Sequence, residues 1–346
     1  MAARTGHTVV APVGIVDVAA RAGVSPSTVS RVLRGAGGVS AGTRERVLAA
    51  AAALDYVPSP AAAGLASGRT RAVGILAPFA TRWFFSEVIR GAESALRDAG
   101  YDMLLYNVGD AASRERFFAT MPLRRRVDAA LVVATAFGAA ERSALTAVRV
   151  PVVGVGGRGT GFPRVGIDDA AGAESAVRHL LALGHRDVVM VSAEPEDPIG
   201  RETTLARRAG FVRALRAAGV EPGPGSVVSR PWGVAGGVRA MEELLTRPEL
   251  PTAVFAECDE MALGALQVLR RTGLDVPGRL SLVGFDDHDM ALVGDLTTIA
   301  QPAHEQGRLA AEQLLAMLAG RPAGGAELPT RLVVRGTTAP PHRGRG

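Results

Sequence analysis

Residues 25–34, SPSTVSRVLR, combine hydroxyl and guanidinium side chains with aliphatic side chains at helical spacing. A helix over residues 26–34 would bury the aliphatic side chains on one face and turn the polar ones toward solvent. The buried set is Val29, Val32 and Leu33, and the outward set is Pro26, Ser27, Ser30, Arg31 and Arg34. Small hydroxyl groups and guanidinium groups on a protruding helix can hydrogen-bond to base edges and phosphates in a DNA major groove. The segment therefore predicts contact with a DNA duplex.

A short helix and a tight turn precede this segment and would hold it in place. The helix spans residues 16–22, and its apolar face is Val18, Ala19 and Ala22. Gly23 suits the left-handed backbone of a turn because glycine has no Cβ atom. Ser25 is a good N-cap, and Pro26 fits the first helical position because its missing N–H needs no partner there. A helix-turn-helix unit is the expected result.

A third helix is expected over residues 41–54, where it would close a small core. Its apolar stripe is expected to be Val47, Leu48, Ala51 and Leu54.

The pattern D-V-A-x-x-A-G-V-S-x-S-T-V-S-R-V-L over residues 17–33, followed by Val39-Ser40 and TRERV, closely resembles a known DNA-binding headpiece. That headpiece belongs to the lactose-repressor-type (LacI/GalR) family of bacterial regulators. The resemblance implies that Pro26 and Ser27 stand at the positions that vary specificity, and that Arg31 forks onto a guanine or a phosphate. The residues that would position the backbone are Ser25, Thr28 and Ser30.

Residues 58–70 are rich in Pro, Gly, Ser and Ala and are expected to form a linker. In the resembled family a hinge helix forms here on the operator, and a leucine wedges into the minor groove. Leu65 stands at that position. Ala63 replaces the polar residue that is usual in the family, and Gly64 and Pro60 weaken a helix, so we expect hinge ordering to be coupled to DNA binding.

The charge of the chain is concentrated at its front. Residues 1–70 carry seven arginines against three acidic residues, a net +4 out of +5 for the whole chain. Phosphate contacts would need this charge on the headpiece. The chain has no lysine, so every cation is a guanidinium that can fork onto phosphate or a guanine edge.

Length and composition favour a cytoplasmic protein of several domains. A chain of 346 residues, 47% hydrophobic, suits one small module and two core-forming lobes. The single cysteine, Cys258, excludes an internal disulfide framework and fits a reducing compartment. The sequence has no apolar run near the ~20 residues of a membrane span, and residues 1–14 lack the apolar region of a secretory signal. We therefore expect no membrane partner.

From Arg71 onward the pattern alternates strands with helices, which indicates parallel sheets covered on both faces. Two such series in tandem predict two doubly wound lobes, with a helix over residues 305–318 and a strand over residues 328–335 closing the second. The resembled family has a periplasmic-binding-protein-like effector domain of this architecture. The expected fold class is therefore α/β with an N-terminal all-α helix-turn-helix headpiece.

The expected domain plan has five parts. They are a disordered arm (1–13), the headpiece (14–57), the hinge (58–70), a two-lobed effector-binding and dimerisation domain (71–336) and a disordered tail (337–346).

Ligands of such sheets bind beyond the carboxyl ends of the strands. The resemblance places an effector pocket there, and the positions that match it are Phe84, Phe85, Arg207, Trp232, Cys258 and Asp286. Aromatic side chains can stack on the apolar face of a sugar ring, and aspartate and arginine can bind its hydroxyls. Cys258 stands where the family usually has an asparagine, and a thiol hydrogen-bonds only weakly.

Other chemistry in the chain is weaker. The segment 154–159 fits G-x-G-x-x-G, but TGFP follows it instead of the helix that a dinucleotide site needs. The acidic residues and the histidine at 286–289 are consecutive on one short loop. If they bound one metal ion together, the backbone of that loop would be strained. His185 at a helix end is interpreted as a dipole cap. We expect no cofactor, no metal and no catalytic residues.

We therefore expect a homodimeric transcriptional regulator that binds a palindromic operator. It is expected to be a repressor and not an enzyme, and to respond to a small molecule, with a sugar as the favoured class. A nucleobase, a phosphosugar or a partner phosphoprotein is the alternative signal. A solute-binding receptor without DNA function and a dehydrogenase are the rival classes. The headpiece argues against the first, and the loop after Gly159 argues against the second.

Overall fold

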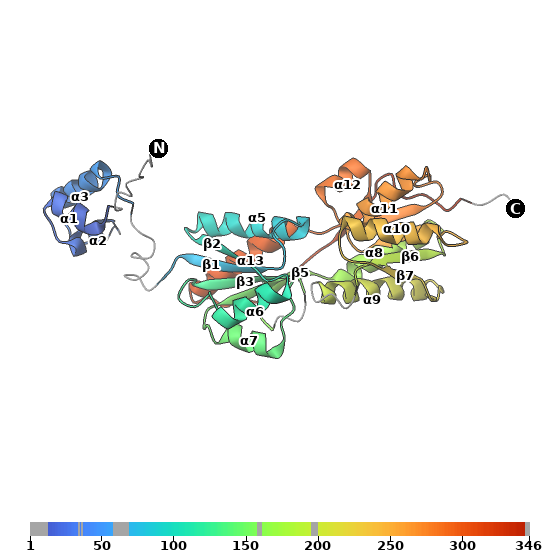
Figure 1. The fold of residues 1–346 in the computed structure, drawn as a ribbon, viewed down its shortest axis with the longest axis horizontal. Coiled ribbons are helices and arrows are strands. Elements are labelled where there is room, and N and C mark those ends of the chain that lie inside the picture. The colour runs from blue at the N-terminus through green and yellow to red at the C-terminus, as the bar shows by residue number, and fades with distance from the viewer. Residues whose placement is uncertain are drawn as a thin grey trace, which may run out of the picture. The chain divides into compact units, whose positions relative to one another are not determined.

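The computed structural model describes residues 13–33, 35, 37–57, 69–157, 161–194 and 200–342 (Figure 1). The contacts between residues divide the chain into two compact units, Met1–Thr70 and Arg71–Gly346.

The first unit contains three helices among its described residues: α1 (Ile15–Ala22), α2 (Pro26–Leu33) and α3 (Ala41–Ala53). Gly23 ends α1 with a φ of 64°, the left-handed conformation expected for the turn. The buried core is Val18, Ala19, Ala22, Val29, Val32, Val47, Ala50 and Ala51. The helix-turn-helix arrangement expected from the sequence is therefore present.

The expected stripe on α3 is partly wrong, because Leu48 is 49% exposed and Ala50 is buried in its place. Residues 47, 50, 51 and 54 follow the i, i+3, i+4, i+7 spacing of one helix face, and position 48 lies outside that face. The side chain of Ser40 caps α3 by accepting a hydrogen bond from the Thr43 backbone N–H at 3.4 Å.

Two six-stranded sheets organise the described part of the second unit, and each lies in its own lobe. In the N-lobe the strand order is β11-β5-β4-β3-β1-β2, and in the C-lobe it is β12-β10-β9-β8-β6-β7. All pairings are parallel except the antiparallel pair β10–β12.

The N-lobe strands are β1 (Ala72–Ala77), β2 (Asp102–Asn107), β3 (Ala129–Val133), β4 (Val152–Val155), β5 (Arg164–Ile167) and β11 (Ala326–Leu328). Its helices are α5 (Trp83–Asp98), α6 (Ala111–Thr120), α7 (Ala139–Thr146) and α13 (Ala303–Leu318). One face of the sheet packs on α5 and α13, and the other packs on α6 and α7. Gly91 and Gly307 let α5 and α13 approach closely, because a Cβ on either would lie 1.9 Å from a backbone oxygen of the other helix.

The C-lobe strands are β6 (Val188–Ser192), β7 (Val227–Ser229), β8 (Ala253–Ala256), β9 (Ser281–Asp286), β10 (Thr297–Ala300) and β12 (Arg331–Val333). Its helices are α8 (Asp169–Ala182), α9 (Arg201–Ala217), α10 (Val234–Leu245), α11 (Asp259–Arg271) and α12 (Asp289–Gly294). Helices α8 and α9 cover one face of the sheet, and α10 and α11 cover the other. Two doubly wound lobes were expected, and both are present.

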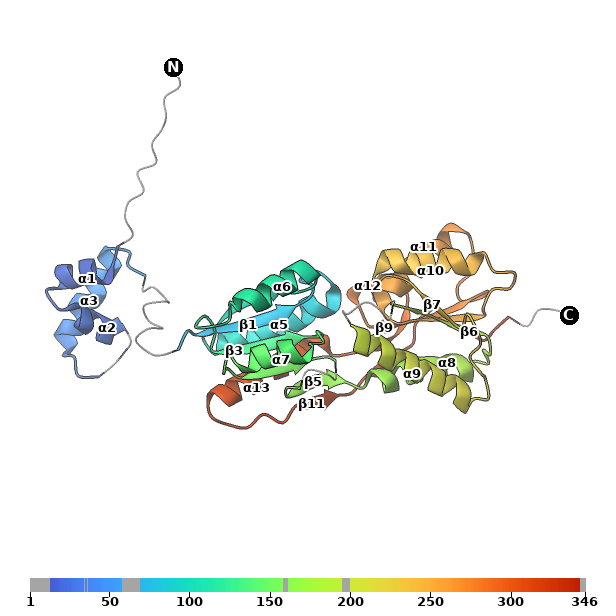
Figure 2. The same cartoon turned by 60° about the horizontal axis from the view of Figure 1, so that its bottom comes forward.

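The strict tandem order of the lobes is wrong. Helix α13 was expected in the second series, but it packs on the N-lobe beside α5 (Figure 2). The strand expected over residues 328–335 is two strands: β11 pairs with β5 in the N-lobe, and β12 pairs with β10 in the C-lobe. Pro329 lies between them, and its fixed φ and missing N–H interrupt a continuous ladder.

Several shorter elements also differ from expectation. Helix α6 ends at Thr120, whereas the sequence predicts a helix over residues 113–125, and Met121 has a φ of 40°. Pro122 disfavours the helical conformation of the residue before it. Strands β5 and β10 and helix α12 were not predicted, because four to six residues carry little periodicity.

The expected disordered tail is wrong for residues 337–342, which the structure describes as part of the second unit. The Thr337 hydroxyl donates to the Leu282 carbonyl at 2.7 Å, and the Leu282 N–H donates to the Thr337 carbonyl at 2.8 Å. These bonds extend the hydrogen bonding of β9 toward the end of the chain.

His185 is not a helix-dipole cap. Its ring nitrogens lie 2.9 Å from the Thr252 hydroxyl and 2.9 Å from the Ala339 carbonyl, inside the C-lobe. Burial lowers the pKa of His185, which favours the neutral ring at pH 7. A neutral imidazole lacks the positive charge with which a histidine stabilises a helix C-terminus.

Among the described residues, no helix is both long and apolar enough to cross a lipid bilayer.

Candidate functional site

The outer face of α2 carries the polar residues expected there. Pro26, Ser27 and Arg31 are exposed, and Ser30 and Thr28 are half-buried. Val29 and Val32 on the opposite side are buried in the headpiece core, which holds the helix in place. Helix α2 has no acidic residue in its first turn.

Three side-chain hydroxyl groups lie within hydrogen-bonding distance of one another at the start of α2. The Ser25 Oγ lies 2.8 Å from the Ser27 Oγ and 2.9 Å from the Thr28 Oγ1. It also accepts a hydrogen bond from the Thr28 backbone N–H at 3.3 Å, so Ser25 caps the helix as expected. The N-terminus of a helix together with such hydroxyls can bind a phosphate. Two of the expected DNA contacts, Arg34 and Leu65, lie outside the described residues, as do residues 1–12 and 58–68.

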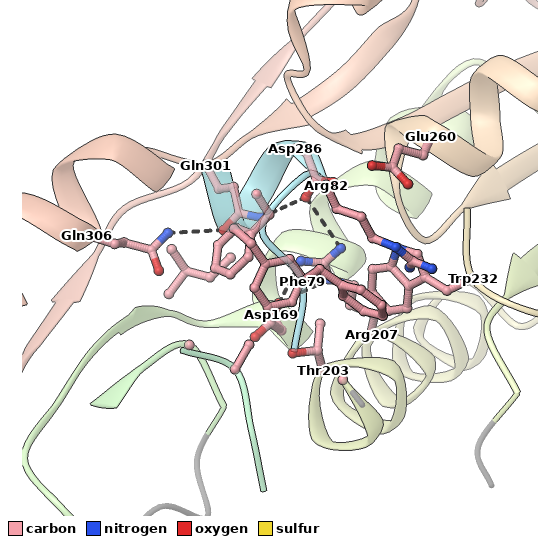
Figure 3. Close-up of a pocket in the computed structure, with 16 residues that line it drawn as sticks. Phe79, Arg82, Asp169, Thr203, Arg207, Trp232, Glu260, Asp286, Gln301 and Gln306 are labelled. Atoms are coloured by element: carbon pink, nitrogen blue, oxygen red, sulfur yellow. Dashed lines mark hydrogen bonds and ion pairs between the residues drawn. The ribbon is translucent and has the colours of Figure 1, made fainter. Parts of the chain in front are cut away.

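A cavity of about 710 Å³, including space open to solvent, lies where strands of both lobes end. Residues of α5 and α13 from the N-lobe and of α9 and β9 from the C-lobe line it (Figure 3). This is the position that doubly wound sheets use for ligands. The lining residues are Phe79, Arg82, Phe84, Phe85, Ala134, Gly156, Ile167, Asp169, Gly200, Thr203, Arg207, Trp232, Glu260, Asp286, Gln301 and Gln306.

Five of the six expected pocket residues lie together on this cavity: Phe84, Phe85, Arg207, Trp232 and Asp286. The expectation for Cys258 is wrong, because it is 1% exposed and packs in the C-lobe core. Cys258 is the N-cap of α11, and it packs in the hydrophobic cluster of the C-lobe and is not part of the cavity lining. Burial raises the pKa of the Cys258 thiol well above its usual value, so the group stays protonated.

Arg207 on α9 is the centre of the polar network. Its Nε and NH2 donate to Asp169 Oδ1 at 3.0 and 2.9 Å, and its NH1 donates to the Glu257 carbonyl. Asp286 Oδ1 lies 3.6 Å from NH1, and the guanidinium carbon is 3.6 Å from the centroid of the Phe285 ring. The guanidinium is therefore held on one face by an aromatic ring and at its edges by oxygen atoms.

More carboxylates than cations are buried around Arg207. Burial raises the pKa of Asp169, and it raises the pKa of Asp286 to about 8 despite the opposing effect of Arg207. Glu257 is fully buried and accepts hydrogen bonds from the Ser192 and Thr204 hydroxyls. One guanidinium cannot neutralise all of these groups, so a proton on Asp286 balances part of the remaining charge near neutral pH.

Several lining residues were not anticipated from the sequence, among them Arg82, Asp169, Glu260, Gln301 and Gln306. The rule that ligands bind beyond strand ends could have indicated Gln301, which follows β10, but β10 itself was not predicted. Gln306 lies on α13, which the sequence pattern assigns to the wrong lobe.

The Gly154–Gly159 segment does not open a helix within the part of the chain that the structure describes. Residues 161 and 162 form a bend, and β5 begins at Arg164. No group of three or more His, Cys, Asp or Glu side chains among the described residues is placed to hold a metal ion.

Comparison with known proteins agrees with both units. Residues 14–59 match bacterial regulatory proteins of the lacI family, and residues 177–338 match a periplasmic binding protein-like domain. The chain is 34% identical to the HTH-type transcriptional repressor CytR of Escherichia coli strain K12 over 328 residues, 93% of this chain and 95% of that protein. It is 33% identical to catabolite control protein A of Priestia megaterium over 302 residues, 86% of this chain and 90% of that protein.

Solved structures show the same architecture. The Lac repressor dimer bound to operator and the anti-inducer ONPF superposes with a TM-score of 0.84 at 27% identity, covering 95% of this chain and 100% of that chain. The complex of the transcriptional regulator CelR with cellobiose gives a TM-score of 0.70 at 32% identity, covering 94% and 99%. By its sequence along almost its full length and by its headpiece, the chain belongs to the LacI family of bacterial regulatory proteins.

Proposed function

We propose that this protein is a transcriptional repressor that binds operator DNA as a homodimer and changes its operator affinity when a small molecule fills the cavity. The observation that carries the proposal is the presence, in one chain, of an exposed recognition-type helix and a ligand cavity between two lobes. The named relatives CytR and catabolite control protein A support a regulatory role in place of catalysis.

The DNA-binding part rests on α2. Its exposed Ser27 and Arg31 can reach base edges, and the net charge of +4 on residues 1–70 supplies phosphate attraction. Arg34 and Leu65 belong to the same proposal by their positions in the sequence.

We infer that the ligand is a neutral molecule with several hydroxyls and an apolar face, such as a sugar. Phe79, Phe84 and Trp232 provide aromatic walls, and Asp169 and Asp286 provide hydrogen-bond acceptors. Arg207 already binds Asp169 and the Glu257 carbonyl and has little capacity left for a phosphate. Arg82 also lines the cavity and could bind an anion, so a phosphosugar belongs among the ligands to be tested.

The regulatory step is a shift between relative positions of the two lobes. A ligand that touches Phe84 in the N-lobe and Arg207 in the C-lobe favours the lobe arrangement that suits both contacts. The N-lobe begins at Arg71, directly after the hinge, so lobe movement can reach the hinge through the chain.

A homodimer is supported by apolar side chains left in solvent on α12. Leu292 is 73% exposed and Val293 is 70% exposed, which is unusual for neighbouring large aliphatic residues on one short helix. A substitution of Leu292 by arginine is expected to shift the full chain toward a monomer in light-scattering measurements, whereas Leu205→Arg on α9 (46% exposed) serves as the matched control.

The test of the whole proposal is a binding measurement with DNA. The full chain is titrated at low salt with duplex fragments from around its own coding region, with and without D-ribose, D-glucose, cellobiose, adenine and glucose 6-phosphate. We expect one fragment to bind and one neutral sugar to change its affinity. Failure to bind every fragment under every condition would overturn the proposal.

A further inference from the structure

One side chain on the cavity has an unused polar atom. Gln306 on α13 is 0% exposed and lines the cavity. Its Nε2 donates to Gln301 Oε1 at 3.0 Å, and its Oε1 has no hydrogen-bond partner among the described residues (Figure 3). A buried carbonyl oxygen without a donor destabilises the free protein, so such groups call for an explanation.

In the hydrogen-bond pattern of the structure, the unused atom is an acceptor. Asp286 Oδ1 accepts a hydrogen bond from Gln301 Nε2 at 2.6 Å, which turns the Gln301 Oε1 toward Gln306. That oxygen needs a donor, so Gln306 must present its Nε2 to Gln301 and its Oε1 elsewhere. The orientation of both amides therefore follows from Asp286 Oδ1 acting as an acceptor, which it does as a carboxylate or as a carboxylic acid protonated on Oδ2.

No side chain among the described residues donates a hydrogen bond to Gln306 Oε1. The Nε and NH1 groups of Arg207 are occupied by Asp169 and by the Glu257 carbonyl. An aromatic wall at Phe84 and Phe85 offers no hydrogen-bonding group. A ligand is thus the natural source of a donor for Gln306.

We propose that Gln306 is a specificity-determining residue, whose Oε1 accepts a hydrogen bond from a hydroxyl or N–H group of the ligand at the N-lobe end of the cavity. This inference rests on the proposed effector function of the cavity. It limits the ligand to molecules that place a donor against Gln306 while another part of them reaches the carboxylates of the C-lobe. A molecule that has an ether or a methylene at that point leaves the carbonyl unsatisfied and binds more weakly.

The test compares hydroxyl-deletion analogues on matched variants. Isothermal titration of the full chain uses D-ribose, D-glucose and cellobiose, each with its set of monodeoxy derivatives. For the sugar that binds, we expect Gln306→Leu to lower the affinity about tenfold. One monodeoxy derivative should bind the wild-type protein about tenfold more weakly than the parent sugar does. The same derivative should bind the wild-type protein and Gln306→Leu with equal affinity. The matched control is Gln313→Leu, because Gln313 is on the same helix, also has an unpartnered Oε1 and does not line the cavity.

The deoxy series separates direct contact from indirect positioning. If Gln306 acted only by orienting Gln301, Gln306→Leu would weaken every analogue by the same factor, and the proposal would be overturned. A Gln306→Leu affinity within twofold of wild type would overturn it as well, while leaving the proposed function intact. If no probe binds the wild-type protein, the neutral-sugar proposal fails and this inference fails with it.

A second variant keeps the test informative if Gln306→Leu does not fold. In Gln306→Glu, a protonated carboxyl can donate to Gln301 and accept from the ligand, as the amide does. Because burial favours the protonated acid, its affinity should match wild type at pH 5 and fall below it at pH 8. The ratio of the Gln306→Glu affinity to the wild-type affinity at each pH removes the contribution of Asp286, which both proteins share. A ratio that does not change with pH would contradict the proposal.

Discussion

The indole ring of Trp83 stacks on the imidazole ring of His288, with centroids 5.5 Å apart and planes inclined by 28°. Trp83 opens α5 in the N-lobe, and His288 is the N-cap of α12 in the C-lobe, so the stack is a direct contact between the lobes. His288 Nδ1 accepts a hydrogen bond from the Met290 N–H, and burial lowers the pKa of His288. The contact therefore involves a neutral ring at pH 7.

The first prediction concerns this stack. A double-mutant cycle with Trp83→Ala and His288→Ala should give a coupling energy of about 0.5–1.5 kcal/mol, the size found for aromatic pairs. Trp83→Phe should retain most of the stability, since the indole Nε1 is buried without a partner among the described residues. Chemical denaturation measures both effects, and additive single substitutions would show that the rings do not couple the lobes.

The second prediction concerns Arg31 on the exposed face of α2. Replacement of Arg31 by alanine should lower operator affinity by about 1–3 kcal/mol, because one guanidinium contact with a base or phosphate is lost. Fluorescence anisotropy with operator duplexes measures the loss. The control Arg97→Ala removes a guanidinium that is paired with Glu93 on α5, and it should leave affinity unchanged.

Operator variants can distinguish the two kinds of contact. If Arg31 reads a guanine, its loss should weaken one operator sequence and flatten the preference at one base pair. If it binds a phosphate, the loss should be uniform across sequences and accompanied by a shallower salt dependence. Wild-type affinity in the alanine variant would exclude both contacts.

The third prediction concerns Arg207. Its removal leaves Asp169 and Asp286 buried without their cation, so Arg207→Met should lower the free energy of unfolding by about 3–5 kcal/mol at pH 8. The loss should be smaller at pH 5, because the unpaired carboxylates take up protons there.

A surface pair on the same helix is the control for this substitution. Arg216 is 61% exposed and pairs with Glu221, so Arg216→Met should cost less than about 1 kcal/mol. An equal loss of unfolding free energy in Arg207→Met and Arg216→Met would show that the buried ion pairs of Arg207 contribute no more stability than an exposed pair.

The fourth prediction concerns pH. The pKa of Asp286 is raised by burial to about 8, above the value near 4 of an unfolded aspartate. Between these values the folded protein holds a proton that the unfolded chain releases, so stability is greatest at the acid end and declines as pH rises toward 8. Asp286→Asn cannot titrate and should flatten this decline.

The measurement is the free energy of unfolding from urea titrations between pH 5 and pH 8.5. Asp98→Asn is the control, since the Asp98 side chain is 77% exposed. A wild-type stability that increases over this range, or an unchanged slope in Asp286→Asn, would contradict the pKa shift.

Local patterns were sufficient for the headpiece. The spacing of Val18, Val29 and Val32, the turn at Gly23 and the cap at Ser25 each act within a few residues, so the two helices and their outward polar face could be predicted. The same spacing misplaced Leu48. Val47 and Leu48 are adjacent and both apolar, so the sequence does not determine which of them is buried until the other helices pack against α3.

In the larger unit, periodicity and composition determined that strands and helices alternate, and the resemblance indicated that Arg207, Trp232 and Asp286 lie at one pocket, where all three line the cavity. Only the tertiary structure decided that α13 returns to the N-lobe, that Cys258 packs in the core and that Gln306 meets Gln301 in the cavity lining. The physical reason is that burial and hydrogen-bond partners come from residues far apart in the chain. A linear pattern records which face of an element is apolar, but it does not record which other element covers that face.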